Sequence, residues 1–356
     1  MTGIGGLGPW PGTDALEAQQ TVLGDLTDLP DGLVGLPWLV RLPGRGPTGT
    51  LAAADGLAHL VDLPVDLGPH GWQLADRPGR DAALLAADRR ERLDVLAIAA
   101  HGYPGPLVLP LCGPLTLAAS VYLARGDRAV ADRGAVVELV ESLAVGAVEH
   151  LAAVRRAVPG ARPVLVVQEP MLAQVVAGVL PSFSGYARLR AVRAPVAAEL
   201  LGRFVDLLRA GGAERVVLHV GAGGDVLPVA RGARPDALGI EVAGLDERRW
   251  EQVAEAVEGG IALWAQVPSP ATSQCAGPDV RALADTVLAG WGWVGLEPRR
   301  LAEVVLVPPP DAGVTDQQLL PGTTVATGSA GGVAQARDVL ATVVRAASVL
   351  AERAEA

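Results

Sequence analysis

Three stretches between residues 163 and 221 decide the fold: PVLVVQE at 163–169, AAELLGRFVDLLRA at 197–210 and RVVLHVG at 215–221. The first and third are short, apolar and rich in valine, which is typical of buried strands. The middle stretch has apolar residues at helical spacing. A strand, a helix and a second strand in this order predict a parallel βαβ unit.

The same alternation extends over the rest of the chain. Short apolar runs predict eight strands, at Thr2–Gly6, Leu57–Asp66, Leu107–Gly113, Pro163–Glu169, Arg215–Gly221, Leu238–Val242, Ile261–Val267 and Val304–Pro308. Helical patterns lie between them, as at Ala135–Ala157, Ala197–Ala210, Glu247–Glu258 and Val280–Trp291. Eight such units predict an α/β fold, a (β/α)8 TIM barrel that forms a single domain over residues 1–356. A doubly wound open sheet is the alternative, and the absence of a Rossmann fingerprint disfavours it.

Composition excludes several classes of protein. The 356 residues are half hydrophobic and carry a net charge of −10, so we expect no nucleic-acid partner. Two cysteines in a chain of this length fit a reducing cytoplasm. The N-terminus lacks the basic and apolar regions of a signal peptide. We therefore expect a soluble, cytoplasmic protein.

One uncharged stretch, Leu107–Ala124, is long enough to be checked as a membrane segment. Pro110, Gly113 and Pro114 interrupt it, so it predicts a buried strand followed by the start of a helix. We expect no membrane partner.

In a barrel of this type the active site lies at the C-terminal ends of the strands. The polar or glycine-rich strand ends are Ile4-Gly5-Gly6, Asp62 and Asp66, Cys112-Gly113-Pro114, Gln168-Glu169-Pro170, His219-Val220-Gly221, Glu241, Gln266 with Ser269, and Asp311-Ala312-Gly313. These residues are the candidates for binding and chemistry.

Two strand ends carry the clearest signals. His219 and Glu241 end successive strands, which lie about 4.8 Å apart in a sheet, so the pair could share a metal or a proton. A histidine that is hydrogen-bonded to a carboxylate without any ligand is the alternative. Glu169 ends a very apolar strand, where we expect a carboxylate either to face the mouth of the barrel or to pair with an arginine.

Weaker signals have structural explanations. Gly221–Asp225 and Gly328–Gly332 are glycine-rich, but the first fits a tight turn and the second an ordinary helix N-terminus. Cys112 and Cys275 lack the spacing of a zinc ribbon.

With these strand ends in place, the chain resembles the catalytic-domain family of cobalamin-independent methionine synthase, in its short, single-domain actinobacterial type. The matching segments are TGIG with PGTD near the N-terminus, LVDLPVDLGPHGWQLADRPGRD at 60–81, GPLTLA at 113–118, VVQEPML at 166–172, VVLHVGAGGDV at 216–226 and VVLVPPPDAGV at 304–314. The resemblance implies a (β/α)8 barrel that transfers a methyl group from a methyl-folate to the thiol of homocysteine, and a zinc ion that activates the thiol.

The resemblance also assigns roles to individual residues. It implies that His219 and Glu241 are metal ligands, and Gly221 and Ala312 stand where the family has cysteines. Two remaining ligands are too few for tight zinc binding, unless Cys112 or Cys275 replaces a lost thiolate. Further site assignments are a substrate-binding set of Ile4, Gly5, Gly6 and Gln168, and two candidate catalytic carboxylates, Glu169 and Asp311. Gly6 replaces a serine of the family and Gln168 replaces an aspartate.

Three functional hypotheses follow. The first is a methyltransferase of this class, acting on a thiol or amino-acid-like substrate with a folate-type or other methyl donor. Its activity is weak or altered because zinc binding is weakened, relocated or dispensed with. The second is a non-catalytic barrel that binds a small molecule or a protein partner. The third is metal-free decarboxylation, as in the uroporphyrinogen decarboxylase relatives that share this fold. It needs arginines near the first strand, whereas the first arginines of the chain are Arg41 and Arg45.

Overall fold

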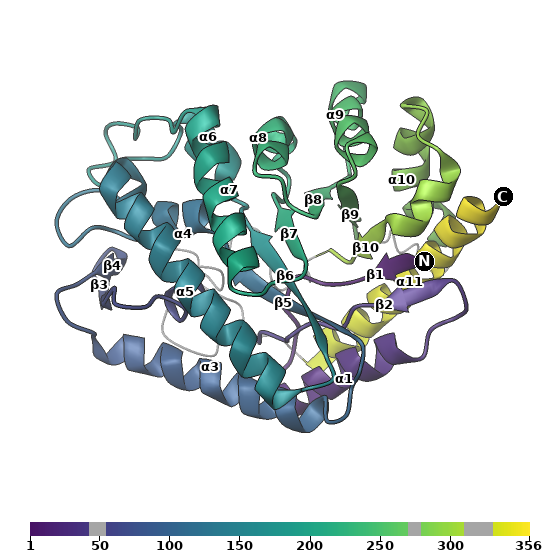
Figure 1. The fold of residues 1–356 in the computed structure, drawn as a ribbon, viewed down its shortest axis with the longest axis horizontal. Coiled ribbons are helices and arrows are strands. Elements are labelled where there is room, and N and C mark those ends of the chain that lie inside the picture. The colour runs from purple at the N-terminus through teal and green to yellow at the C-terminus, as the bar shows by residue number, and fades with distance from the viewer. Residues whose placement is uncertain (43–54, 270–278, 310–329) are drawn as a thin grey trace.

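The computed structural model describes residues 1–42, 55–269, 279–309 and 330–356 (Figure 1). Eight parallel strands form one sheet in the order β2-β1-β10-β9-β8-β7-β6-β5. They are β1 (Thr2–Ile4), β2 (Leu33–Gly35), β5 (Pro106–Cys112), β6 (Arg162–Gln168), β7 (Val216–His219), β8 (Ala237–Glu241), β9 (Ala262–Gln266) and β10 (Val305–Val307).

The two outer strands of this sheet meet, because the chain directly after β2 pairs with β5. Trp38 and Val108 form a parallel bridge, in which the Val108 N–H donates to the carbonyl of Pro37 at 2.7 Å. The Leu39 N–H donates to the Val108 carbonyl at 2.9 Å. Each outer strand therefore gains a second neighbour. The predicted (β/α)8 barrel is confirmed, and the open doubly wound sheet is not formed.

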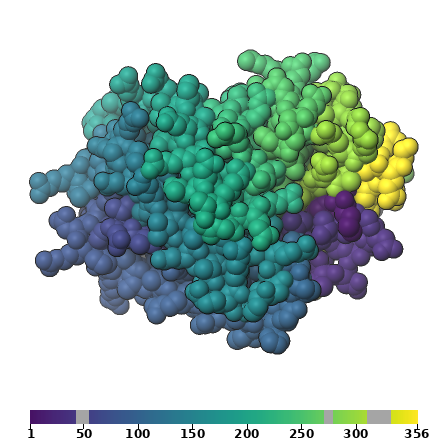
Figure 2. Space-filling model, viewed as in Figure 1, coloured from purple at the N-terminus to yellow at the C-terminus, as the bar shows by residue number. Residues whose placement is uncertain are grey.

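Helices lie outside the strands (Figure 1). They are α1 (Ala15–Thr27), α3 (Arg80–Ala99), α4 (Pro114–Ser120), α5 (Arg133–Ala157), α6 (Leu172–Ala177), α7 (Ala194–Ala210), α8 (Leu227–Gly232), α9 (Glu247–Glu258), α10 (Val280–Trp293) and α11 (Ala330–Glu355). Short 3-10 turns lie at Ala129–Ala131, Gly224–Val226 and Pro298–Glu303. Figure 2 shows the same view with all side chains, and the teal and green segments that include α5 and α7 form the middle of this face.

Capping side chains and apolar stripes explain where the helices begin and which faces they bury. Asp132, Asp246 and Asp279 each accept a hydrogen bond from a backbone N–H of the first turn, at the starts of α5, α9 and α10. Helix α7 buries one apolar stripe that includes Leu201, Phe204 and Leu208. All four predicted helices are confirmed, with ends that differ by three residues or fewer. None of the helices in the described part of the chain is long and apolar enough to cross a membrane.

Seven of the eight predicted strands are confirmed, each with ends within two residues of the expected ones. The second prediction, Leu57–Asp66, is wrong. Its last residues belong to an antiparallel hairpin of β3 (Val65–Gly68) and β4 (Gly71–Leu74), outside the barrel sheet. The second barrel strand is β2, which has only three residues.

Candidate functional site

The ends of three neighbouring strands point side chains into the barrel at one level. Cys112 pairs with Gln168, and Gln168 pairs with His219. Paired residues on parallel neighbours point to the same side of the sheet. The Gln168 amide donates to the carbonyl of Leu7 at 2.6 Å, although β6 and β1 are not neighbours in the sheet. This side is therefore the interior of the barrel.

Gln168, which the sequence predicted to bind substrate, forms hydrogen bonds within the protein. Besides its bond to Leu7, its Oε1 accepts from the guanidinium of Arg41 at 3.4 Å. Arg41 also donates to the Leu7 carbonyl, at 2.7 Å. Both side chains converge on one carbonyl group just beyond β1, which fixes the chain at that point.

Arg41 belongs to a buried ionic network that sequence reasoning missed. It lies 3.4 Å from Asp55, whose other oxygen accepts from Arg92 at 3.0 Å. Burial acts to raise the pKa of Asp55, but the positive charges of Arg41 and Arg92 outweigh it and hold the pKa at about 2. The signal in the sequence was a single arginine within the apolar run LPWLVRLP at 36–43.

The position of Arg41 corrects our expectation that no arginine lies near the first strand. It is 34 residues distant from Leu7 in sequence, yet it contacts the segment just after β1. Separation along the chain was therefore a poor guide to separation in space.

Glu169, a predicted catalytic residue, is fully buried at the start of α4. One of its carboxylate oxygens accepts from the Leu115 N–H at 2.8 Å, and the other accepts from the N–H and the hydroxyl of Thr116, both at 2.7 Å. Thr116 Oγ1 in turn accepts from the Met171 N–H at 3.2 Å, so its own hydrogen points to Glu169. The carboxylate therefore caps a helix.

The pKa of Glu169 reflects two opposed effects. Burial raises the pKa to about 7, and the hydrogen bonds from Thr116 and Leu115 act against this rise. The helix N-terminus at α4 adds a favourable electrostatic environment for the carboxylate. Both oxygens of the Glu169 carboxylate accept hydrogen bonds, from three donors in total. The carboxylate therefore connects the end of β6 to the start of α4.

The glycines of the predicted substrate-binding segment have packing roles. Ile4 is fully buried. A β-carbon on Gly5 would lie 3.1 Å from the ring of Trp264, and one on Gly6 would lie 2.5 Å from the ring of Trp38. The serine that the family resemblance leads us to expect at position 6 would therefore displace Trp38.

His219 is the residue with the clearest unused polar atom. Its side chain is 3% exposed, and its Nδ1 accepts a hydrogen bond from the Gly221 N–H at 3.2 Å. Burial lowers the pKa of His219 to about 3, so the ring is neutral near neutral pH. With Nδ1 acting as acceptor, the ring proton is on Nε2, which has no partner among the described residues.

Glu241 lies on the same side of the sheet as His219, one strand away. His219 pairs with Gly239, and Glu241 is two residues further along that strand. The Glu241 N–H donates to the carbonyl of Gly221 at 2.9 Å. The structure thus brings the two predicted metal ligands to neighbouring strand ends.

These residues do not fit a zinc site. Within the described parts of the chain, no group of three or more His, Cys, Asp or Glu side chains could hold a metal ion. Gly221 offers no ligand, and its φ of +60° places it in the left-handed region that favours glycine. The Nδ1 lone pair of His219 is already used. Asp311, Ala312 and Cys275 lie outside the described residues.

Cys112 does not supply the missing thiolate. It is separated from His219 by the Gln168 position of the intervening strand. Burial raises the pKa of the Cys112 thiol well above its usual value, and the negative charge of Glu169 adds to this. The thiol remains protonated at neutral pH.

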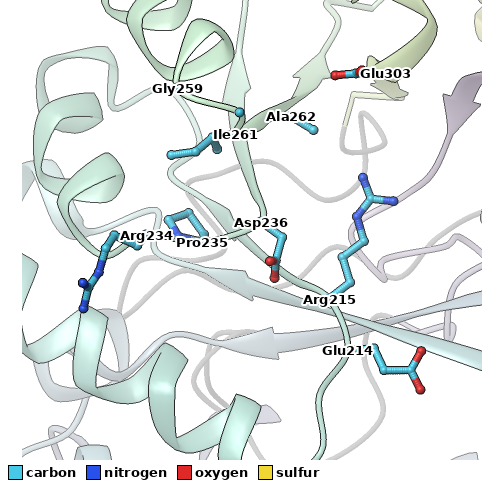
Figure 3. Close-up of a pocket in the computed structure, with 10 residues that line it drawn as sticks. Glu214, Arg215, Arg234, Pro235, Asp236, Gly259, Ile261, Ala262 and Glu303 are labelled. Atoms are coloured by element: carbon cyan, nitrogen blue, oxygen red, sulfur yellow. The ribbon is translucent and has the colours of Figure 1, made fainter.

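A cleft of about 650 Å³ lies at the other end of the barrel, at the N-terminal ends of β7, β8 and β9. Figure 3 shows charged side chains around it, and Glu214, Arg215 and Asp236 point in different directions. Asp236 accepts from the Val216 N–H at 2.7 Å and from Arg209 at 3.0 Å, so it joins two strands and a helix. This end of a barrel is associated with stability rather than catalysis.

Comparisons with known proteins show a likeness of fold. No protein-family model and no curated protein matches the chain. A B12-independent methionine synthase from Shewanella sp. W3-18-1, solved in complex with selenomethionine, has a TM-score of 0.60 and 12% identity, and the match covers 98% of this chain and 97% of that one. A putative vitamin-B12 independent methionine synthase from Listeria monocytogenes has a TM-score of 0.48 and 14% identity, over 84% and 76% of the two chains. The chain therefore shares the barrel fold of a methionine synthase structure along nearly its whole length.

Proposed function

We propose that the protein is a methionine-synthase-like methyltransferase with weak or altered activity. It binds a small thiol or amino-acid-like molecule at the C-terminal end of the barrel and takes a methyl group from 5-methyltetrahydrofolate or another donor. The observation that carries the proposal is the full-length match to a methionine synthase barrel, in which the motif residues Gln168, His219 and Glu241 end neighbouring strands. Two cysteines in a chain of this length support a cytoplasmic location.

The proposed weakness has a chemical reason. A free thiol with a pKa of about 8.5 is only a few per cent ionised at neutral pH. The described residues do not form a metal site that could increase this fraction. Burial leaves His219 neutral, with Nδ1 bonded to the Gly221 N–H, so it is poorly suited to take up the thiol proton. Methyl transfer to such a thiol is therefore slow.

A second function, a non-catalytic barrel that binds a small molecule or a partner, is favoured by one observation. The two polar residues at the end of β6 are both occupied: Gln168 by Leu7 and Arg41, and Glu169 by the start of α4. These hydrogen bonds within the protein give both residues a structural role.

The two functions are separated by one assay with a paired binding measurement. We expect methyl-folate and homocysteine to give turnover below the ordinary enzyme rate of about 1 per second or more. We also expect calorimetric binding of L-homocysteine that weakens in Glu241→Gln. The control is Glu303→Gln, which changes a carboxylate in the cleft at the other end of the barrel. Turnover at an ordinary rate would contradict the weak activity, and binding without any turnover would favour the second function.

A further inference from the structure

Two buried N–H groups in the described part of the barrel strands lack hydrogen-bond acceptors. On the eight barrel strands, the unpartnered buried side-chain polar atoms among the described residues are His219 Nε2 and Trp264 Nε1. His219 is 3% exposed and Trp264 is fully buried. Burying a donor without an acceptor is unfavourable, so such atoms are rare in folded proteins. An acceptor supplied by a ligand would explain both.

Glycines on neighbouring strands make room for the two rings. A β-carbon on Gly239 would overlap the Cδ2 atom of His219, so the imidazole lies over that glycine. Gly239 is itself the register partner of Trp264 on the next strand. The far edge of the Trp264 ring reaches Gly5, which directly follows β1, across β10. Both rings therefore lie inside the barrel, on either side of a position that has no side chain.

The hydrogen-bond pattern makes His219 a donor. Because Nδ1 accepts from the Gly221 N–H, the neutral ring carries its hydrogen on Nε2. A metal ion would need the lone pair that this hydrogen replaces. Trp264 Nε1 is a donor in any state. The two groups together can bind only an acceptor.

The nearby charge favours an anionic acceptor. Gln168 pairs with His219 on the sheet, and the buried guanidinium of Arg41 lies 3.4 Å from Gln168 Oε1. Arg41 and Arg92 share the single buried carboxylate of Asp55, although Arg92 also contacts Asp88 at 3.0 Å. The guanidinium of Arg41 would attract a carboxylate on the Gln168 side of His219. The Glu241 carboxylate lies on the other side of His219, at the end of β8.

We propose that the barrel interior at His219 and Trp264 is a binding site for a carboxylate group of the ligand, with His219 Nε2–H and Trp264 Nε1–H as donors in the place where a metal would lie. This proposal rests on the ligand position given under the proposed function. It adds the chemical group that the protein recognises.

The tautomer of His219 is the first test. Long-range ¹H–¹⁵N correlation spectra of the intact protein, with His219→Gln to assign the signal, should show a neutral ring with its hydrogen on Nε2. Added zinc should leave the signal unchanged. A ring with its hydrogen on Nδ1, or a signal that shifts on addition of zinc, would overturn the proposal.

The second test uses three matched probes in calorimetry: L-methionine, L-methioninamide, which lacks the carboxylate, and desamino-methionine, which lacks the amine. We expect the two carboxylates to bind and the amide to bind at least about tenfold more weakly, as expected for a hydrogen bond to a charged group. Trp264→Phe should weaken the binding of desamino-methionine about tenfold. The matched control is Trp72→Phe, because Trp72 on β4 also buries an unpartnered Nε1 but lies outside the barrel sheet.

The outcomes separate this proposal from the proposed function. The carboxylate site is contradicted if L-methioninamide binds as tightly as the two acids, or if Trp72→Phe weakens binding as much as Trp264→Phe. Either result leaves the proposed function, with an amino-acid-like ligand at this end of the barrel, intact. If none of the three probes binds, both the carboxylate site and the proposed amino-acid-like ligand are contradicted.

Discussion

The ends of β6 and β7 are neighbours in the sheet, yet their polar residues are in opposite situations. Glu169 is fully buried and accepts three hydrogen bonds, which hold the first turn of α4. His219 is buried to a similar degree, and its Nε2 has no partner among the described residues. A buried polar group whose bonds are all made supports the fold, whereas one that is left unmatched is available to a ligand.

The same comparison applies to the glycines at these ends. Gly113 is needed because a β-carbon there would overlap the Glu169 carboxylate, and Gly239 is needed because a β-carbon there would overlap the His219 ring. The first glycine lets a cap approach a helix. The second lets a ring lie flat over the next strand. Substitutions at the Glu169 end should therefore mainly change stability, whereas substitutions at the His219 end should also change ligand binding.

The largest effect is expected from Glu169→Ala, which removes the acceptor for two buried N–H groups and a hydroxyl. We expect the free energy of unfolding to fall by about 3–5 kcal/mol, measured by urea denaturation. Glu169→Gln keeps the shape and one acceptor, and should lose only about 1–3 kcal/mol. Unchanged stability in both variants, together with lost activity, would show that Glu169 is catalytic instead.

The next largest effect is expected at the end of β7, where His219 lies. Gly239→Ala places a methyl group where the imidazole lies, and should reduce the free energy of unfolding by about 1–3 kcal/mol and weaken ligand binding. The control is Gly292→Ala on α10, where no atom lies within 4 Å of the new methyl group. That change should stabilise the protein by about 0.5–1 kcal/mol. Intact ligand binding in Gly239→Ala would show that the position of His219 is unimportant.

The effect with the smallest change per step is a pH dependence with opposite signs at the two strand ends. The pKa of Glu169 is raised from 4.5 to about 7, so the folded state holds this proton more tightly, and the contribution to stability falls as pH rises through that window. The pKa of His219 is lowered from 6.5 to about 3, so its contribution falls as pH drops below 6.5. Each slope is at most about 1.4 kcal/mol per pH unit.

This pH dependence is measured by urea denaturation of His219→Phe and Glu169→Gln against the unchanged protein. Between pH 4.5 and 6.5, the stability difference from the unchanged protein should change in opposite directions for the two variants. Other buried groups, such as Asp55 and His59, are common to all three proteins and cancel in the differences. Differences that change in the same direction would contradict one of the two pKa shifts.

Much of this architecture could be predicted from the sequence, because each barrel strand except one is a distinct apolar run. The second strand was missed because LVG at 33–35 is too short to show a pattern, while the alternating residues near Asp66 belong to a hairpin. The role of Glu169 was also out of reach. Its partner Thr116 lies 53 residues away, and only the folded chain brings the two together.

The candidate site was predictable in part. The residues Gln168, His219 and Glu241 were identified at strand ends, and the structure places them on neighbouring strands. Their hydrogen bonds were not predictable, since they depend on distant carbonyl and N–H groups such as those of Leu7. The buried pairing of Arg41 with Asp55 was missed for the same reason.

We expect the site at His219 and Glu241 to function without zinc, and the zinc content of the purified protein decides this. The measurement is elemental mass spectrometry of tag-free protein prepared without chelator. The Gly221→Cys, Ala312→Cys double variant is the comparison, because it restores both cysteines that the family resemblance implies. We expect almost no zinc in the unchanged protein and strong uptake in the double variant. About one zinc ion per unchanged chain would contradict it.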